Sequence, residues 1–164
     1  MEPCFNLIEA NRHDLLTWNK TKGNNTNVTK KPRINTLIGY SLSEEAHINK
    51  ISKPTQISLV QLENGDLISK NIDAFGKIGF GINAYDRLDG AINRNGLYSL
   101  EMTVNCNQVF QFTANKFSFS ESRLINSYID FERLIKLKQR VQKCYVEHEM
   151  NNLSLYKKLV NMII

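Results

Sequence analysis

Five short runs of alternating apolar and polar residues follow Pro32, and they restrict the possible fold more than any other feature of the chain. Clusters of Asn, Gly and Asp, residues that favour turns, separate them. The runs are residues 34–40, 55–62, 77–85, 96–104 and 108–114. Because successive side chains of a strand point to opposite sides, a period of two indicates strands with one buried face. The pattern therefore predicts a mainly β chain of antiparallel strands.

Three of these runs also predict which side chains form the core. The expected core positions are Ile78, Phe80, Ile82 and Ala84 in one strand, Tyr98, Leu100, Met102 and Val104 in the next, and Phe110 and Phe112 in a third. Residues 105–107 between the last two strands are typical of a tight hairpin turn. Phe117 and Phe119 alternate in a further short run. Aromatic side chains at this spacing occur in β cores far more often than as platforms for stacked bases.

Residues 76–98, GKIGFGINAYDRLDGAINRNGLY, raise the question of a ligand-binding loop. A dinucleotide fingerprint needs a third glycine where this chain has Ala84, and a phosphate loop needs a Lys-Ser/Thr pair that is absent. Calcium stays open as the weaker alternative, because oxygen atoms are its ligands. The candidate ligands are Asp86, Asp89, Asn93 and Asn95, but Met102 stands where the calcium motif needs an acid.

The favoured interpretation of the same residues is structural. Asp and Asn bond to their own turns, and Gly supplies positive φ. Gly90, Gly96 and Tyr98 are then the corner between two strands, similar to the tyrosine corner of immunoglobulin-like sandwiches. A positive φ at Gly96 would make that position intolerant of any side chain.

The two ends of the chain differ from the β region. Residues 19–32, NKTKGNNTNVTKKP, are polar and predict a linker after a short apolar N-terminal stretch. After Ser120 the pattern favours a helix that Ser120 opens, with one apolar face formed by Phe131, Leu134, Ile135, Val141 and Tyr145. Residues 126–130 and 140–146 are also compatible with strands.

The sequence contains few signals of catalysis or of metal binding. Cys4, Cys106 and Cys144 are far apart, which argues against a disulfide framework and a thiolate zinc site. His13, His47 and His148 form no zinc-type pair, and no serine lies in a nucleophile elbow. We expect no catalytic residue, no metal site beyond the weak calcium candidates, and no cofactor.

The net charge is +5, with two basic clusters. The clusters are Lys20, Lys22, Lys30, Lys31 and Arg33, and Arg133, Lys136, Lys138, Arg140 and Lys143. Solvated surface is the favoured interpretation, and a nucleic-acid-binding module that uses residues 20–33 and 133–143 is an alternative. No apolar run approaches the ~18 residues of a membrane span, and residues 1–16 lack the features of a signal peptide.

The chain resembles the region that follows the catalytic domain in lysostaphin/LytM-type zinc metalloendopeptidases of Gram-negative bacteria. The matching blocks, in order, are Gly76 to Gly81, Asp86 to Gly90, Asn93 to Tyr98, Ile129 to Phe131, and Gln142 to Tyr145, and residues 2–13 are similar to the trailing edge of the peptidase module. The resemblance implies an immunoglobulin-like β-sandwich. It carries over no catalytic residue, because the zinc ligands of the family are not present here.

The sequence therefore predicts a non-catalytic accessory domain of a peptidoglycan-cleaving enzyme, which positions or regulates the peptidase or binds an envelope partner. The expected organisation is a tail and linker (1–32), an antiparallel β-sandwich (33–119) and a helical or strand extension (120–164), whose abrupt end suits a fragment. Family resemblance places an exported parent protein in the cell envelope or periplasm. Nucleic acid is not the expected partner, and a stand-alone hydrolase is a further alternative.

Overall fold

The computed structural model describes residues 9–11, 32–69, 71–87, 92–104, 107–114, 116, 118–145 and 153–159, and all structural statements below concern these residues. The strands are β1 (Glu9–Asn11), β2 (Arg33–Ser41), β3 (His47–Ile48), β4 (Thr55–Ile57), β5 (Leu59–Gln61), β6 (Leu67–Ser69), β7 (Ala74–Phe75), β8 (Ile78–Tyr85), β9 (Ser99–Val104), β10 (Asn107–Thr113), β11 (Gln142–Lys143) and β12 (Tyr156–Leu159). The helical elements are the 3₁₀ turn η1 (Phe119–Arg123), α2 (Ile125–Tyr128) and α3 (Phe131–Leu137).

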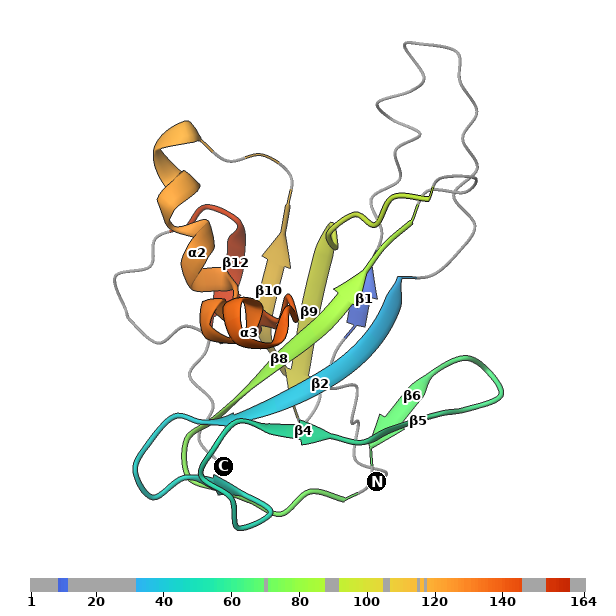
Figure 1. The fold of residues 1–164 in the computed structure, drawn as a ribbon, viewed down its shortest axis with the longest axis vertical. Coiled ribbons are helices and arrows are strands. Elements are labelled where there is room, and N and C mark those ends of the chain that lie inside the picture. The colour runs from blue at the N-terminus through green and yellow to red at the C-terminus, as the bar shows by residue number, and fades with distance from the viewer. Residues whose placement is uncertain are drawn as a thin grey trace.

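The described strands form two four-stranded sheets and two small ribbons. The β9 sheet has the order β1-β9-β10-β12, and the β8 sheet has the order β11-β8-β2-β4 (Figure 1). β3 pairs with β7, and β5 pairs with β6. Every one of these pairings is antiparallel. The prediction of a mainly β chain with antiparallel strands and a helical segment toward the C-terminus is confirmed.

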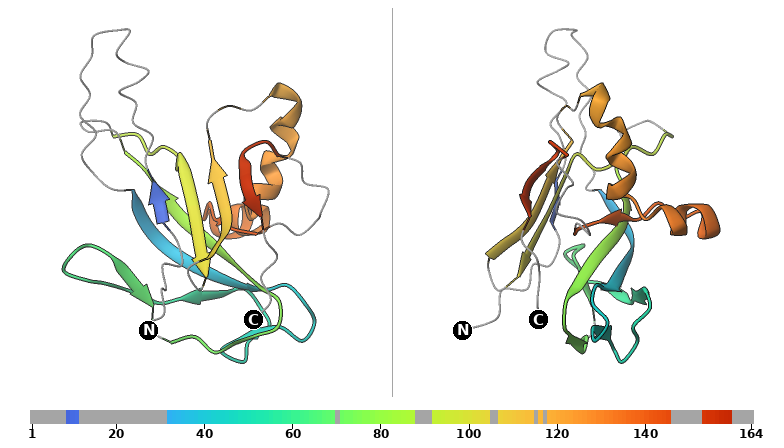
Figure 2. Two further views of the ribbon diagram at one scale, coloured as in Figure 1. Left: turned by 180° about the vertical axis from the view of Figure 1, so that it is seen from behind. Right: turned by 90° about the vertical axis from the view of Figure 1, so that its left-hand side faces the viewer.

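The inner faces of the two sheets share one hydrophobic core. Ile78, Phe80 and Ile82 of β8 are at most 4% exposed, as their alternation predicts. From the β9 sheet, Leu100 and Phe110 belong to the same buried cluster. The right-hand view of Figure 2 shows the two sheets as separate layers. Removing side chains of this size from water stabilises a fold by about 1.5–3 kcal/mol each, so this shared core explains why the sheets associate.

The outer face of the β8 sheet carries a second, smaller cluster, which the alternation does not predict. It consists of Ile38, Tyr40, Val141 and Tyr145, with Leu42 packed against it. Gly79 and Gly81 leave room for it, since a Cβ at Gly79 would lie 2.5 Å from Cδ1 of Tyr145 and one at Gly81 would lie 2.8 Å from Cγ1 of Val141. The glycines of β8 therefore act in packing.

The two sheets also contain strands from the predicted N-terminal tail and from the predicted C-terminal extension. The β9–β10 hairpin is confirmed, with Asn107 opposite Val104, although residues 105 and 106 lie outside the described part. β1 from the predicted tail pairs with β9, while β12 from the predicted extension pairs with β10. β11 joins the edge of β8. The predicted strand 55–62 is divided into β4 and β5.

The predicted continuous helix after Ser120 is wrong. Ser118, rather than Ser120, precedes η1, and three short helical elements replace one helix. Ile129 has extended backbone, and Lys138 adopts the left-handed conformation at φ 56° that ends α3. Val141 and Tyr145 consequently lie beyond the helices, in and beside β11.

The core prediction also fails for Phe119, and Phe117 lies outside the described residues. Phe119 is 96% exposed at the start of η1, so it does not continue the buried alternation of Phe110 and Phe112. The chain leaves the β9 sheet after Thr113, which removes the alternating geometry on which that prediction depended.

Candidate functional site

The structure brings together two of the four candidate calcium ligands through their backbones. Asp86 and Asn95 exchange hydrogen bonds of 3.0 and 2.8 Å between main-chain N–H and C=O groups, which closes the base of the loop. The Asp86 carboxylate also accepts a bond of 2.8 Å from the N–H of Arg87. Asn93 is exposed, and Asp89 lies outside the described residues. The calcium site therefore stays a prediction.

Two arginines contact the ring of Tyr85 at the base of the loop. The guanidinium carbons of Arg87 and Arg94 lie 5.2 and 4.7 Å from the centre of the Tyr85 ring. Such cation–π contacts attract guanidinium groups to the ring face. These contacts place two positive charges at the Tyr85 ring. In the described residues no group of three or more His, Cys, Asp or Glu side chains has the geometry to hold a metal ion.

The corner residues have mixed outcomes. Gly90 lies outside the described residues. The backbone of Gly96 lies outside the left-handed region, and a Cβ there would meet no atom within 4 Å, so the condition for intolerance to a side chain at Gly96 is not met. Tyr98 is half-buried, and its carbonyl accepts a 2.7 Å bond from the N–H of Ala114. This bond ties the loop before β9 to the end of β10.

Of the chain's histidines, the described part contains His47 alone, because His13 and His148 lie outside it. The His47 ring stacks on Phe75 with centroids 5.4 Å apart, and its Nδ1 lies 3.1 Å from the carbonyl oxygen of Glu45. Cys144 is fully buried, and burial raises the pKa of its thiol to about 12. A thiol that stays protonated at neutral pH is a poor nucleophile.

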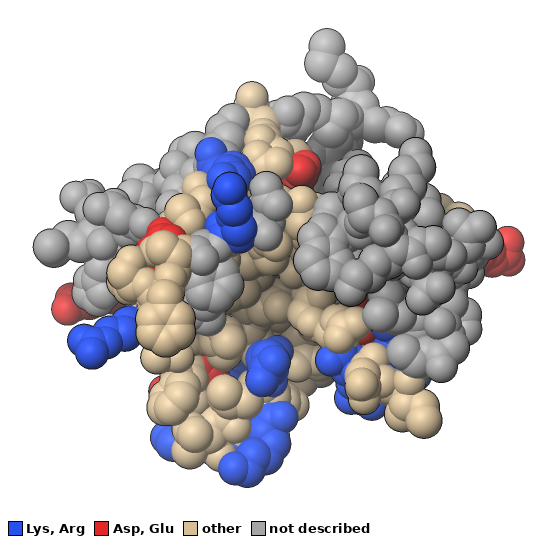
Figure 3. All heavy atoms as spheres, turned by 90° about the horizontal axis from the view of Figure 1, so that it is seen from above, with Lys and Arg blue, Asp and Glu red and all other residues tan. Residues whose placement is uncertain are grey.

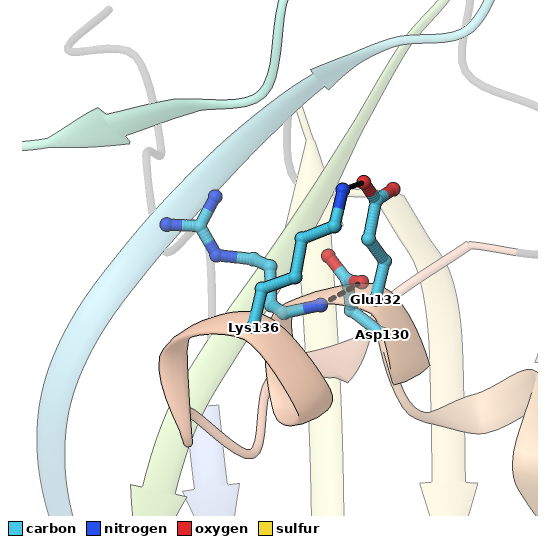
Figure 4. A network of polar contacts seen from close by, with 4 residues as sticks. Asp130, Glu132 and Lys136 are labelled. Atoms are coloured by element: carbon cyan, nitrogen blue, oxygen red, sulfur yellow. Dashed lines mark hydrogen bonds and ion pairs between the residues drawn. The ribbon is translucent and has the colours of Figure 1, made fainter.

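A buried polar contact anchors α3 to the outer face of the β8 sheet. The Tyr40 hydroxyl donates a 2.7 Å hydrogen bond to Oδ2 of Asp130, and Oδ1 of the same carboxylate accepts from the N–H of Arg133 at 3.0 Å. Figure 4 shows Asp130 at the first turn of the helix, where it acts as the N-cap. Burial is the largest cause that raises the pKa of Tyr40 well above its usual value, and the bond to Asp130 is the next largest. The phenol therefore keeps its proton and stays a donor.

Residues 130–141 form a projecting segment, which we call the α3 loop. Its base is closed by a 2.9 Å bond from the N–H of Asp130 to the carbonyl of Val141 and by a bridge between Ile129 and Gln142. In the right-hand view of Figure 2, α3 stands out from the face of the β8 sheet.

The α3 loop exposes apolar and basic side chains together. Phe131, Ile135 and Leu137 are 58%, 54% and 55% exposed, and α3 buries none of its residues. The predicted apolar face of this segment therefore points largely to solvent. Lys136 and Glu132 form an exposed ion pair of 2.6 Å, drawn in Figure 4.

The second basic cluster lies in and just after this loop, with Lys138 and Arg140 exposed. Of the first cluster, Arg33 is described and exposed, and the other members lie outside the described residues. Seen from above, Lys and Arg side chains are more prominent than acidic ones among the described residues (Figure 3).

Sequence reasoning missed the Tyr40–Asp130 contact and the exposure of the α3 loop. One signal for the N-cap at Asp130 was available, because an Asp directly before an apolar stretch is typical of a helix start. Ninety residues separate Tyr40 from Asp130, so no local pattern identifies them as partners.

Comparison of the chain with known protein families, with curated proteins and with solved structures gives no match. Among the described residues, no helix is both long and apolar enough to cross a bilayer.

Proposed function

We propose that the chain is a non-catalytic accessory domain that holds a LytM-type zinc metalloendopeptidase module in position in the cell envelope. We further propose that the β9 and β8 sheets form an immunoglobulin-like β-sandwich. Two antiparallel sheets with a common core support this architecture. The ordered series of sequence blocks from Gly76 to Tyr145 supports the link to the peptidase family.

The observation that carries the proposal is the pairing of β1. Residues 2–13 resemble the trailing edge of the peptidase module, and from this segment Glu9–Asn11 pair with β9, with Ala10 opposite Leu100. A module attached at this end would be held by strand pairing in addition to its covalent link. Such pairing restricts how the module reorients relative to the β9 sheet.

The test joins a LytM-type peptidase module to Met1 and measures the rate of peptidoglycan digestion. The N–H groups of successive strand residues point to opposite edges, so among Ala10 and Asn11 one points toward β9 and the other away from it. Proline removes the N–H and is tolerated only where it points away from the sheet. Ala10→Pro and Asn11→Pro are therefore a matched pair, one of which breaks the pairing while the other is its control.

We expect the joined protein to digest peptidoglycan at a rate different from that of the module alone, and the pairing-breaking proline to restore the module's own rate. The isolated chain should not digest it. Equal rates for both proline variants and the unchanged fusion would refute positioning through β1. Stoichiometric zinc together with digestion by the isolated chain would make it an enzyme in its own right.

A further inference from the structure

We propose that the α3 loop docks onto a membrane surface that contains anionic lipids. This inference is independent of the proposed role toward a peptidase, because it rests on a different element, on the opposite sheet from β1. It begins from the fixed position of α3, which core packing does not explain. The structure fixes α3 firmly although no residue of the helix is buried.

Polar contacts hold both ends of α3. At its start, Asp130 joins the helix to β2 through the Tyr40 hydroxyl at 2.7 Å. At its end, Lys138 takes the left-handed conformation, and the N–H of Gln139 bonds to the carbonyl of Arg133. Within α3 only Arg133 and Leu134 are half-buried, so fixing the helix gains little hydrophobic energy. The arrangement instead presents the exposed side chains in a defined geometry.

The exposed side chains of α3 suit a bilayer interface. Phe131 and Ile135 are four residues apart and so lie on the same side of the helix, while Leu137 is exposed near its end. An apolar group flanked by basic residues enters the boundary between headgroups and acyl chains and keeps its charges among the headgroups.

The charge of the loop selects anionic lipids. Residues 130–141 contain four basic residues and two acidic residues, a net charge of +2. Of the two acids, Asp130 is buried and bonded to Tyr40, and the exposed Glu132 is paired with Lys136 at 2.6 Å. Lys138 and Arg140 are also exposed. Basic residues close to an anionic membrane strengthen binding about fivefold each.

Nucleic acid is the competing anionic partner, and the apolar side chains favour lipid over it. Phosphate contacts need only the basic residues, and a stacked base needs an aromatic ring. Ile135 and Leu137 provide neither a positive charge nor an aromatic ring, but the transfer of both side chains into an acyl layer is favourable in free energy. The two partners therefore predict different effects of removing Ile135.

The test measures sedimentation of the full chain with vesicles of phosphatidylcholine alone and of phosphatidylcholine with phosphatidylglycerol. Two double variants probe the loop, namely Phe131→Ser with Ile135→Ser, and Lys138→Gln with Arg140→Gln. Val60→Ser with Ile68→Ser is the matched apolar control, since these side chains are 50% and 48% exposed on the β5–β6 ribbon. Lys50→Gln with Lys53→Gln, both exposed, is the matched charge control. Thermal unfolding verifies that each variant is folded.

We expect binding to the anionic vesicles only. Each loop double variant should lose at least about tenfold in binding, and the controls should bind like the unchanged chain. Absence of vesicle binding would overturn the proposal, as would equal losses in the loop variants and the controls. Binding to a DNA oligonucleotide that depends on Lys138 and Arg140 but not on Phe131 and Ile135, without vesicle binding, would assign the loop to nucleic acid instead.

Discussion

At the scale of single residues, the outer face of β8 depends on the absence of a side chain at Gly79. The ring of Tyr145 occupies the space where that side chain would lie, with Cδ1 at 2.5 Å and Cγ at 2.7 Å from the position of a Cβ. These atoms belong to the rigid base of a buried ring, so they cannot move aside cheaply. Gly79 is therefore both a residue of strand β8 and the position that leaves room for the second cluster.

Gly79→Ala is expected to lower the free energy of unfolding by about 1–3 kcal/mol, the usual cost of overpacking a core. Urea unfolding of both proteins measures the difference. Gly96→Ala is the control, because a Cβ there meets no atom within 4 Å and the backbone is not left-handed. The control should stay within about 0.5 kcal/mol of the unchanged chain. Similar losses at both positions would contradict the packing explanation.

Tyr40, Tyr128 and Tyr156 have buried hydroxyl groups, which allows a comparison of a bonded hydroxyl with unbonded ones. Tyr40 donates to Asp130 at 2.7 Å, whereas the buried hydroxyls of Tyr128 and Tyr156 have no hydrogen-bond partner among the described residues. Burial raises the pKa of both Tyr128 and Tyr156, so each phenol stays neutral. An unsatisfied buried hydroxyl opposes folding, while a bonded one does not.

We therefore expect opposite results from the same chemical change. Tyr40→Phe should destabilise the fold by about 1–3 kcal/mol, because it leaves the buried Asp130 oxygen without its donor. Tyr128→Phe and Tyr156→Phe should leave the stability unchanged or raise it. Thermal unfolding at neutral pH ranks the three variants, and a loss at Tyr128 as large as that at Tyr40 would show that the Tyr128 hydroxyl has a favourable partner.

At the scale of elements, η1 and β12 are joined by one carboxylate. Glu121 accepts hydrogen bonds from the N–H of Ser118 at 2.8 Å, and from the N–H and Oγ of Ser154 at 2.8 and 3.1 Å. The backbone donors of Ser118 and Ser154 lower the pKa of Glu121 from 4.5 to about 2. Glu121 thereby fixes the turn before β12 to the helical segment 33 residues earlier.

The pH dependence of stability follows from the direction of this pKa shift. A carboxyl group whose pKa is lowered by folding contributes stability above its unfolded pKa, and this contribution is lost as pH falls through the folded pKa. The effect of Glu121 should therefore be complete above about pH 4.5 and disappear toward pH 2.

Melting temperatures measured between pH 2 and 7 test this expectation. Glu121→Gln should flatten the acid limb of the profile, since a neutral amide accepts fewer of these bonds and does not titrate. Glu132→Gln is the control, as it removes only an exposed ion pair of the kind that contributes little. Parallel profiles for the unchanged chain and Glu121→Gln would refute the role of the carboxylate.

Elements with a strong local pattern were the predictable ones. Phe80 and Ile82 alternate with glycine, so their burial follows from a period of two. The break between α2 and α3 was not predictable from the apolar spacing. Ile129 is extended and ends α2, and Asp130 then caps α3 through the N–H of Arg133 while its other oxygen accepts from Tyr40 on a distant strand. Phe131 and Ile135 fit a helical face, but periodicity does not say whether such a face meets a core or solvent.

At the scale of the whole molecule, the hydrophobic core extends across the boundary predicted at residue 119. Tyr128, Cys144, Leu153 and Leu155 belong to the same buried cluster as Phe80 and Phe110. Tyr128 stacks on Phe112 with ring centroids 4.1 Å apart. The β-region and the extension are thus parts of one hydrophobic unit, and pairings between segments far apart in sequence were the part that local patterns did not reveal.

A fragment of residues 33–119 is consequently expected to lack cooperative unfolding. It loses the buried leucines at 153 and 155, each worth about 2–5 kcal/mol when truncated to alanine, a total comparable to the stability of a small domain. Thermal unfolding of the fragment and of the full chain, followed by circular dichroism, makes the comparison. A sharp transition in the fragment would restore the boundary predicted at residue 119.

The close packing on the outer face of β8 also limits how this sequence can diverge. A methyl group at position 79 requires a smaller side chain than the Tyr145 ring, whereas one at position 81 would meet both Val141 and Tyr40, at 2.8 and 2.9 Å. In related proteins we expect a larger residue at position 79 to occur together with a smaller one at position 145. Positions 79 and 145 would then covary, although they are 66 positions apart along the chain.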